Sequence, residues 1–185
     1  MTKTTLMAAA AAIVALGCQR DAQQDAAKDT TGATTATASP STTVATFDGV
    51  GRARIGATVA QLREAGSVPD AAPGAAACRI VRLDWMPPGT RAMFAHDTLV
   101  RIEVDSTATT RTVEGAAIGD AESRIHELYP RVETQPEKYV ATNHNLIVAS
   151  PNDTLRRMIF TTDGKTVRGY RIGRRPAVDF VEGCG

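Results

Sequence analysis

Apolar and polar positions divide the chain into three regions. Residues 6–17 form a short apolar run, LMAAAAAIVALG, and residues 19–46 carry almost no large apolar side chain. Residues 47–185 then alternate short apolar segments with Gly, Pro and Asp. The third pattern is typical of a folded domain, because each apolar segment can bury one face of a strand or helix.

The first amphipathic segment of the folded region predicts a helix that begins after Thr58. Thr58 and Gln61 have the spacing of a capping box, in which each side chain binds a backbone N–H of the other. Apolar residues recur at helical spacing from Val59 to Ala65, and Gly66 is expected to end the helix.

A second amphipathic segment predicts a helix after Asp120. Asp120 is expected to cap this helix, and Glu122 suits the positive end of the helix dipole. Apolar positions within Ile125–Tyr129 form one stripe, and Pro130 ends it.

Several apolar segments predict strands. Two pairs flank short turns and are expected to form hairpins, at His96-Asp97-Thr98 and at Asp163-Gly164. The predicted strands are Cys78–Trp85, Arg91–His96, Leu99–Val104, Leu155–Thr162, Lys165–Ile172 and Val178–Val181.

The order of these features repeats along the chain. Ile55-Gly56, a helix and a hairpin are followed by Ile118-Gly119, a helix and a hairpin, at an offset of about 65 residues. We therefore expect an α+β domain of two helix-plus-antiparallel-hairpin repeats, about 50–105 and 113–175. They would share one antiparallel sheet with both helices on one face. Chance similarity of two amphipathic helices is the alternative.

The first residues have the parts of a secretory signal. Lys3 supplies a positive charge, an apolar run follows, and small residues precede Cys18. The run is too short to span a bilayer as a helix, which needs about 20 residues. The alternative to a lipoprotein signal is a plain secretory signal in which Cys18 has no role.

The segment Val14-Ala15-Leu16-Gly17-Cys18 resembles the lipobox of bacterial lipoproteins. The resemblance implies that residues 1–17 are removed and that Cys18 carries a diacylglyceryl group and an acyl chain such as palmitate. Gln19, in place of the Asp that resembles an inner-membrane retention signal, implies the outer membrane, facing the periplasm. Several acyl chains on one cysteine would anchor the protein permanently.

Residues 18–46 are expected to be a lipidated cysteine and a disordered tether. Residues 19–46 contain no aromatic residue, no Leu, Ile or Met, and a single Val. Such a segment cannot bury enough apolar surface to offset the entropy lost on ordering. The alternative is a short helix over Asp21–Asp29, which would have no apolar stripe to dock with.

Composition limits the classes of function. The 185 residues suit one ordinary domain, which we place at 47–185, and are 43% hydrophobic, 22% charged and 4% aromatic. Lys and Arg number 21 against 20 Asp and Glu, a formal net charge of +1. Because nucleic-acid binders carry a basic excess, this balance argues against that class.

Three cysteines occur in the sequence: Cys18, Cys78 and Cys184. If Cys18 is acylated, an even pair remains in an oxidising compartment, which predicts a Cys78–Cys184 disulfide. A metal site is the alternative, but the sequence has no Cys-x-x-Cys or His-x-x-x-His spacing. We therefore expect neither a metal nor a cofactor.

The sequence offers no recognisable catalytic set. His96, His126 and His144 are scattered over a turn, a helix and a loop, and no Gly-x-Ser-x-Gly segment is present. Paired carboxylates such as Glu103 and Asp105 fit the surface of a strand. We therefore expect a protein that is not an enzyme.

Basic residues concentrate near the second hairpin and its counterpart in the first repeat. They are expected either to be a solvated strand face or to form a patch that binds an anionic envelope component or an acidic protein. A few aromatic residues could add an interface hot spot. The candidate patch comprises Arg101, Arg168, Arg171, Arg174 and Arg175 with Trp85, Tyr139 and Tyr170.

The helix entry Ile118-Gly119-Asp120 with its apolar stripe, and the ending Glu182-Gly183-Cys184 after an Arg-rich strand, resemble several exported bacterial domains. These are the SmpA/OmlA-type lipoproteins, the tandem-repeat β-lactamase inhibitory proteins, and a set of uncharacterised proteobacterial lipoproteins. The resemblance implies a helix-on-sheet fold and a non-enzymatic role in binding another envelope component. The alternative is a periplasmic enzyme inhibitor, or an enzyme with an unrecognised site. The oligomeric state is left open.

Overall fold

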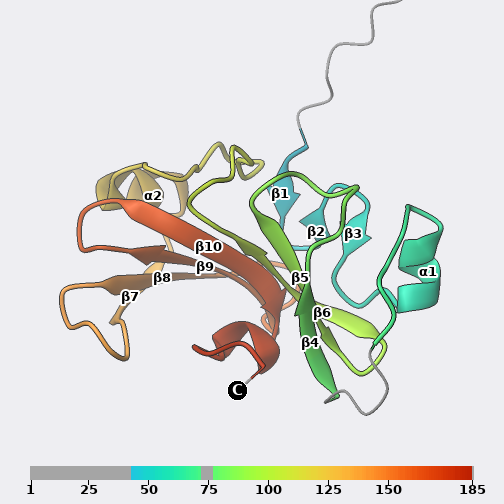
Figure 1. The fold of residues 1–185 in the computed structure, drawn as a ribbon. Coiled ribbons are helices and arrows are strands. Elements are labelled where there is room, and N and C mark those ends of the chain that lie inside the picture. The colour runs from blue at the N-terminus through green and yellow to red at the C-terminus, as the bar shows by residue number, and fades with distance from the viewer. Residues whose placement is uncertain (1–42, 72–76, 185) are drawn as a thin grey trace, which may run out of the picture. The chain divides into compact units, whose positions relative to one another are not determined.

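The computed structural model describes residues 43–71 and 77–184. Its main element is a seven-strand antiparallel sheet (Figure 1). In spatial order its strands are β4 (Cys78–Val81), β5 (Thr90–Ala95), β6 (Thr98–Val104), β10 (Val167–Arg174), β9 (Arg156–Thr162), β8 (His144–Ala149) and β7 (Glu133–Pro136). A small antiparallel sheet contains β1 (Ala45–Thr46), β2 (Gly49–Val50) and β3 (Ala53–Arg54).

The fold is mostly β, with less helix than the expected α+β class implies. The two α-helices are α1 (Val59–Arg63) and α2 (Glu122–Leu128), and a 3-10 helix, η1 (Ala177–Asp179), follows the last strand. Both α-helices are short because each apolar stripe covers only one to two turns. The predicted antiparallel sheet is confirmed.

The cap predicted for α1 is confirmed, and the cap predicted for α2 is wrong. The Gln61 backbone N–H donates to Thr58 Oγ1 at 3.3 Å, and the Thr58 N–H donates to Gln61 Oε1 at 2.9 Å. The N-cap of α2 is Ala121, without a side-chain cap. Asp120 is occupied elsewhere, because its Oδ2 accepts from the Ala117 N–H at 2.9 Å and closes the preceding turn.

Both predicted hairpins are present, as β5–β6 and β9–β10. The strand predicted at Cys78–Trp85 ends at Val81, because the chain turns where the Met86 N–H donates to the Leu83 carbonyl at 2.9 Å. The strand predicted at Val178–Val181 is wrong, since this segment begins with η1 and leaves the sheet. Sequence reasoning missed β7, β8 and the three-strand sheet.

Equivalent hydrogen bonds join each helix entry to the hairpin that follows it. Gly56 N–H donates to the Leu99 carbonyl at 2.7 Å, and Gly119 N–H donates to the Val167 carbonyl at 2.9 Å. The return bonds run from Leu99 N–H to Ala57 and from Val167 N–H to Asp120, both at 2.9 Å. Strands β6 and β10 then pair antiparallel at the centre of the sheet.

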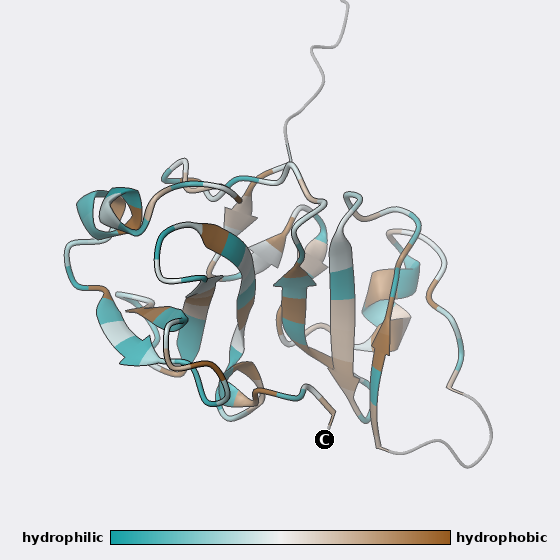
Figure 2. Ribbon diagram, turned by 60° about the vertical axis from the view of Figure 1, so that its left-hand side comes forward, coloured by the Kyte–Doolittle hydropathy of each residue, from teal (hydrophilic) through white to brown (hydrophobic). Residues whose placement is uncertain are grey.

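The main core lies on one face of the seven-strand sheet. It contains side chains from β1–β3, from both α-helices and from the sheet itself, so these elements share one apolar cluster. Phe160 is fully buried there, with ring centroids 5.6 Å from Tyr129 and 5.4 Å from Tyr170. Hydrophobic and hydrophilic residues alternate along the strands, as expected for a sheet whose two faces differ (Figure 2).

The signal peptide predicted at 1–17 and the lipidated Cys18 lie outside the described residues. Strand β1 begins at Ala45, which is fully buried, so the folded domain starts before the predicted boundary at Phe47. In the described part of the chain, no helix has the length and apolar character needed to cross a bilayer.

Candidate functional site

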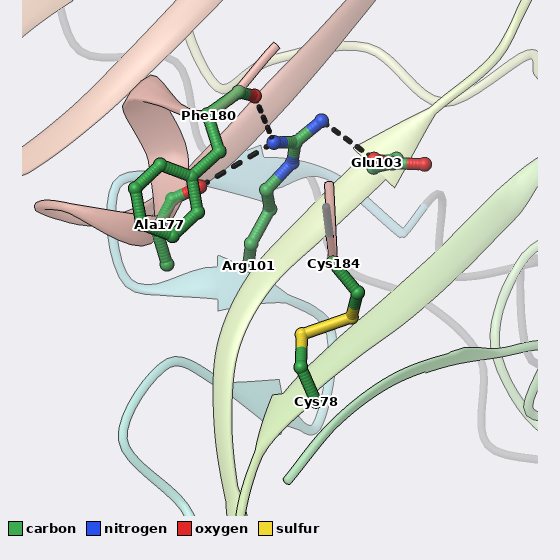
Figure 3. The surroundings of a disulfide bond; sticks show 6 residues. All are labelled: Cys78, Arg101, Glu103, Ala177, Phe180 and Cys184. Carbon is green, nitrogen blue, oxygen red and sulfur yellow. Dashed lines mark hydrogen bonds and ion pairs between the residues drawn. A yellow bond between two sulfur atoms is a disulfide. The ribbon is translucent and has the colours of Figure 1, made fainter. Parts of the chain in front are cut away.

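The second face of the sheet is crossed by residues 177–184, which we call the C-terminal strap. Val178 packs on Ile147 of β8 and Ile159 of β9 in a small separate apolar cluster. At the other end, the Cys78–Cys184 disulfide joins the strap to β4, which confirms the predicted pairing (Figure 3). The strap therefore spans the sheet from β8 and β9 to the edge strand β4.

Arg101 of β6 holds the middle of the strap from below (Figure 3). The residue is only 5% exposed, and its Nη1 donates to the carbonyls of Phe180 at 2.6 Å and Ala177 at 3.3 Å. Its Nη2 donates to Glu103 Oε1 at 2.6 Å. Burial lowers the pKa of Arg101, and the carboxylate of Glu103 opposes that effect.

Arg171 of β10 lies beside Arg101 and binds the strap at Val178, between the two carbonyls that Arg101 binds. Its Nε donates to the Val178 carbonyl at 2.7 Å, and its Nη1 donates to Thr161 Oγ1 at 3.2 Å. Burial, together with the nearby charge of Arg101, lowers the pKa of Arg171 to about 10. Arg171 therefore remains a cation at neutral pH.

Asp179 fixes the start of the strap through two more arginines. Arg157 Nη1 donates to Asp179 Oδ1 at 3.2 Å, and Arg175 Nε donates to Asp179 Oδ2 at 2.6 Å. Four guanidinium groups and one disulfide bond therefore fix the eight residues of the strap against this face of the sheet.

Two hollows flank the strap on this sheet face. The first, of about 420 Å³, is lined by residues that include Arg91, Glu103, Thr161 and Gly169. The second, of about 560 Å³, is lined by residues that include Glu133, Arg157, Ile159 and Asp179. Both are lined by Asn145, Arg171 and Val181, so they meet at the strap.

The structure brings only part of the predicted arginine patch together. Arg101 and Arg171 lie on neighbouring strands, and Arg175 is joined to the strap through Asp179. Arg168 lines the first hollow and is paired with Asp163. Arg174 donates to Asp153 at 3.1 Å and lies an odd number of positions from Arg171 on β10, so it is on the opposite face.

The three aromatic residues expected in the patch do not join it. Tyr170 is 3% exposed in the main core, where its hydroxyl donates to the Thr110 carbonyl at 2.9 Å. Trp85 packs beside Gly66, and its Nε1 donates to the Ser67 carbonyl at 2.9 Å. Tyr139 is exposed in the β7–β8 connection, with the Lys138 amino group 4.8 Å from its ring.

Arg174 and Tyr170 fall outside the patch for the same physical reason. Tyr170 points to the core because side chains alternate between the two faces of β10, and Arg171 takes the other face. Sequence reasoning also missed Asn145, Thr161 and Val181, which line the first hollow. Alternation along β9, next to the fully buried Phe160, is the signal that could have placed Thr161 on this face.

One histidine lies beside a carboxylate. His144 Nδ1 is 2.9 Å from Glu122 Oε1, and the hydroxyl of the fully buried Thr162 also donates to that carboxylate. Glu122 begins α2, so the group ties this helix to β8 and β9. Neither His144 nor Glu122 lines the two hollows beside the strap.

Within residues 43–71 and 77–184, no group of three or more His, Cys, Asp or Glu side chains is placed to hold a metal ion.

Comparison with known proteins gives no further assignment. No family model, characterised protein or solved structure matches the chain. Functional interpretation therefore depends on the geometry of the strap-crossed face.

Proposed function

We propose that this chain is a non-enzymatic, lipid-anchored protein of the bacterial cell envelope. Its folded domain binds another envelope component through the strap-crossed sheet face. The observation that carries this proposal is the pair of hollows beside the strap, which are lined by Arg171 and other charged and polar side chains. The lipobox-like segment ending at Cys18 supports the anchor and its placement at the outer membrane.

The position of the face supports this role. Strands β1–β3 contribute to the main core on one side of the seven-strand sheet, and the strap lies on the other side (Figure 1). The strap and the two hollows therefore lie on the sheet face that the main core does not occupy, where a partner can reach them.

The charge of the face favours an anionic partner. Arg91 and Arg101 share the carboxylate of Glu103, and Arg171 lies opposite Glu103 on β10. The first hollow as a whole is lined by four arginines and three carboxylates. Such an excess of positive charge attracts anions over several ångströms and strengthens specific binding at short range.

We also propose that the domain consists of two repeats, about 50–105 and 113–175. The equivalent hydrogen bonds at Gly56–Leu99 and Gly119–Val167 support this, as does the central antiparallel pairing of β6 with β10. The resemblance to SmpA/OmlA-type and tandem-repeat inhibitory domains has the same implication. The repeats would place both helices on the face opposite the strap.

The anchor is tested by a Cys18→Ser variant in cell fractionation. The unchanged protein is expected in the membrane fraction, and the variant in the soluble periplasmic fraction. A variant that still partitions with membranes would overturn the lipid anchor.

Binding is tested by photo-crosslinking of the anchored protein in its own envelope. A photoreactive residue at Val181, which is 41% exposed at the junction of the hollows, is expected to capture a discrete partner. The matched control is the same residue at Val113, which is 61% exposed beside β1. Equal capture from both positions, or capture from neither, would contradict the proposal.

A further inference from the structure

The first hollow is lined by four arginines and three carboxylates, and one of the arginines forms no ion pair within the described residues. Arg91 Nη2 lies 2.7 Å from Glu103 Oε2, and Arg101 Nη2 lies 2.6 Å from Glu103 Oε1. Glu103 thereby serves two guanidinium groups. Its partner in the register of β6 and β10 is a third arginine, Arg171.

Arg171 contacts no described carboxylate directly, although Asp179, Glu103 and Glu137 lie near enough to oppose the lowering of its pKa by burial. Among the residues that the structure describes, it forms no ion pair, and its hydrogen bonds use only Nε and Nη1. Its Nη2 is therefore free to donate. Desolvation lowers the pKa of Arg171, and a bound anion would offset that cost of burial.

Two hydrogen bonds between side chains orient a second donor, the Asn145 amide, near Arg171. Arg171 Nη1 donates to Thr161 Oγ1, and the Thr161 hydroxyl donates to Asn145 Oδ1 at 3.3 Å. With Oδ1 accepting, the Nδ2 of Asn145 is the donor end of the amide. Nδ2 makes no hydrogen bond within the described chain, so it can donate to a ligand next to Arg171 Nη2.

Two glycines let β10 approach β6 closely beside these donors. Gly169 and Gly173 flank Arg171 on the same face of β10, and Gly169 lines the first hollow. A Cβ at Gly169 would lie 3.1 Å from the Val104 carbonyl oxygen, and one at Gly173 would lie 2.6 Å from the Val100 carbonyl oxygen. Neither position therefore adds a side chain that could cover the Arg171 guanidinium.

We propose that the first hollow is a carboxylate-binding site in which Arg171 Nη2 and Asn145 Nδ2 hold the two oxygens of a peptide-like partner's carboxylate. This inference rests on the proposed function, since it names the chemistry recognised by the same face. Two adjacent N–H donors match the planar, bidentate geometry of a carboxylate.

The surrounding charges favour a carboxylate over a phosphate. Glu103, Asp105 and Glu137 also line the first hollow, and they repel a dianion more strongly than a monoanion. One unpaired guanidinium matches a single negative charge. A phosphate dianion would require a second free cation.

The experiment uses the full chain and follows the NMR signals of Gly169 and the Asn145 side chain. The probes are N-acetyl-trialanine with a free terminal carboxylate, its C-terminal amide, and N-acetyl-alanyl-glutamate amide, which carries a side-chain carboxylate. Inorganic phosphate is the fourth probe. Saturable shifts are expected with the carboxylate probes, and about tenfold weaker binding is expected with the terminal amide, because one charge-assisted contact is lost.

Variants separate this site from general loss of structure. Asn145→Ala leaves every strap contact in place and is expected to weaken carboxylate binding by about tenfold, as is Arg171→Gln. Arg174→Gln, on the opposite face of the same strand, is the matched control and is expected to bind as the unchanged protein does. Comparison of the terminal and side-chain carboxylates then identifies which source the hollow prefers.

Equal binding of the acid and the amide would overturn the carboxylate site, as would tighter binding of phosphate or unchanged binding in Asn145→Ala. The proposed function fails separately. If capture at Val181 persists while acid and amide bind equally, the binding face stands and the carboxylate site falls. If the probe with the free carboxylate binds but the residue at Val181 captures no partner, the carboxylate site stands and the proposed binding of an envelope component falls.

Discussion

Arg101 and Phe180 are 79 residues apart in the chain, yet the Arg101 guanidinium donates to the Phe180 carbonyl at 2.6 Å. This contact places a buried cation under the strap and links the centre of the sheet to the end of the chain (Figure 3). Because the same guanidinium also binds Glu103, its removal affects both the strap and a carboxylate.

Replacement of Arg101 by Ala is expected to lower the free energy of unfolding by about 3 kcal/mol, because it removes the donor of two strap carbonyls and leaves Glu103 with Arg91 as its remaining ion-pair partner. Urea unfolding measures this change. Arg168→Ala is the control, since the Arg168 side chain is 65% exposed and its ion pair with Asp163 is expected to contribute little to the free energy of unfolding. Similar losses in both variants would argue against a structural role for Arg101.

Loss of the Cys78–Cys184 bond is expected to destabilise the domain by about 4 kcal/mol in the chain-entropy account, because the bond closes a long loop. Unfolding with and without reductant, and of the Cys78→Ser/Cys184→Ser variant, measures the loss. Hydrogen exchange is expected to rise first in residues 177–184 while β9 and β10 stay protected. Labelling of both thiols in the native protein would contradict the disulfide itself.

Two glycines with positive φ are expected to respond differently to alanine. Gly56 has φ +94° and nothing near its Cβ position, so Gly56→Ala should cost about 1–2 kcal/mol of backbone strain. Gly49 has φ +138°, and a Cβ there would lie 1.9 Å from the Ala53 carbonyl oxygen. The unfolding free energy of Gly49→Ala should therefore fall further than that of Gly56→Ala, and the reverse order would refute this account of the close approach of β2 and β3.

The Asp163 carboxylate should make stability depend on pH under acidic conditions. The backbone N–H of Thr166, assisted by Arg168 and the Lys165 N–H, lowers the pKa of Asp163 to about 2. Because the pKa is lower in the folded state, the contribution is fully present above the ordinary value, near 4, and is lost as the pH falls towards 2. The stability difference between the unchanged protein and Asp163→Asn should be constant from pH 5 to 8 and shrink below pH 4. A difference independent of pH would contradict the prediction.

Features held together by near neighbours could be predicted from the sequence. The Thr58–Gln61 capping box and the turns at His96-Asp97 and Asp163-Gly164 depend on residues within a few positions of each other, and all three are present. Strand β8 was missed although Leu146, Ile147 and Val148 form a β-branched-rich apolar run. Strand β7 offered no such signal, because all four of its residues are exposed.

The candidate site was only partly predictable. Arg101 and Arg171 were expected at a solvated or ligand-binding surface, but burial under the strap gives each a structural contact as well. The expected strand at Val178–Val181 became a 3-10 turn and a strap. Strand β10 already pairs with β6 and β9 on its two sides, so no central position remains for it.

The sequence by itself determined the two hairpins and the cap of the first helix, because these depend on hydrogen bonds between near neighbours. It also determined that two cysteines remain to pair if Cys18 is acylated, because this depends only on the number of cysteines. It also supplied the lipobox-like segment on which the envelope proposal depends. Only the tertiary structure decided which arginines are buried, which face the strap covers and where the hollows lie. Those properties depend on segments as far apart as Arg101 and Phe180, and no local pattern of polar and apolar residues records which distant segment will cover a face.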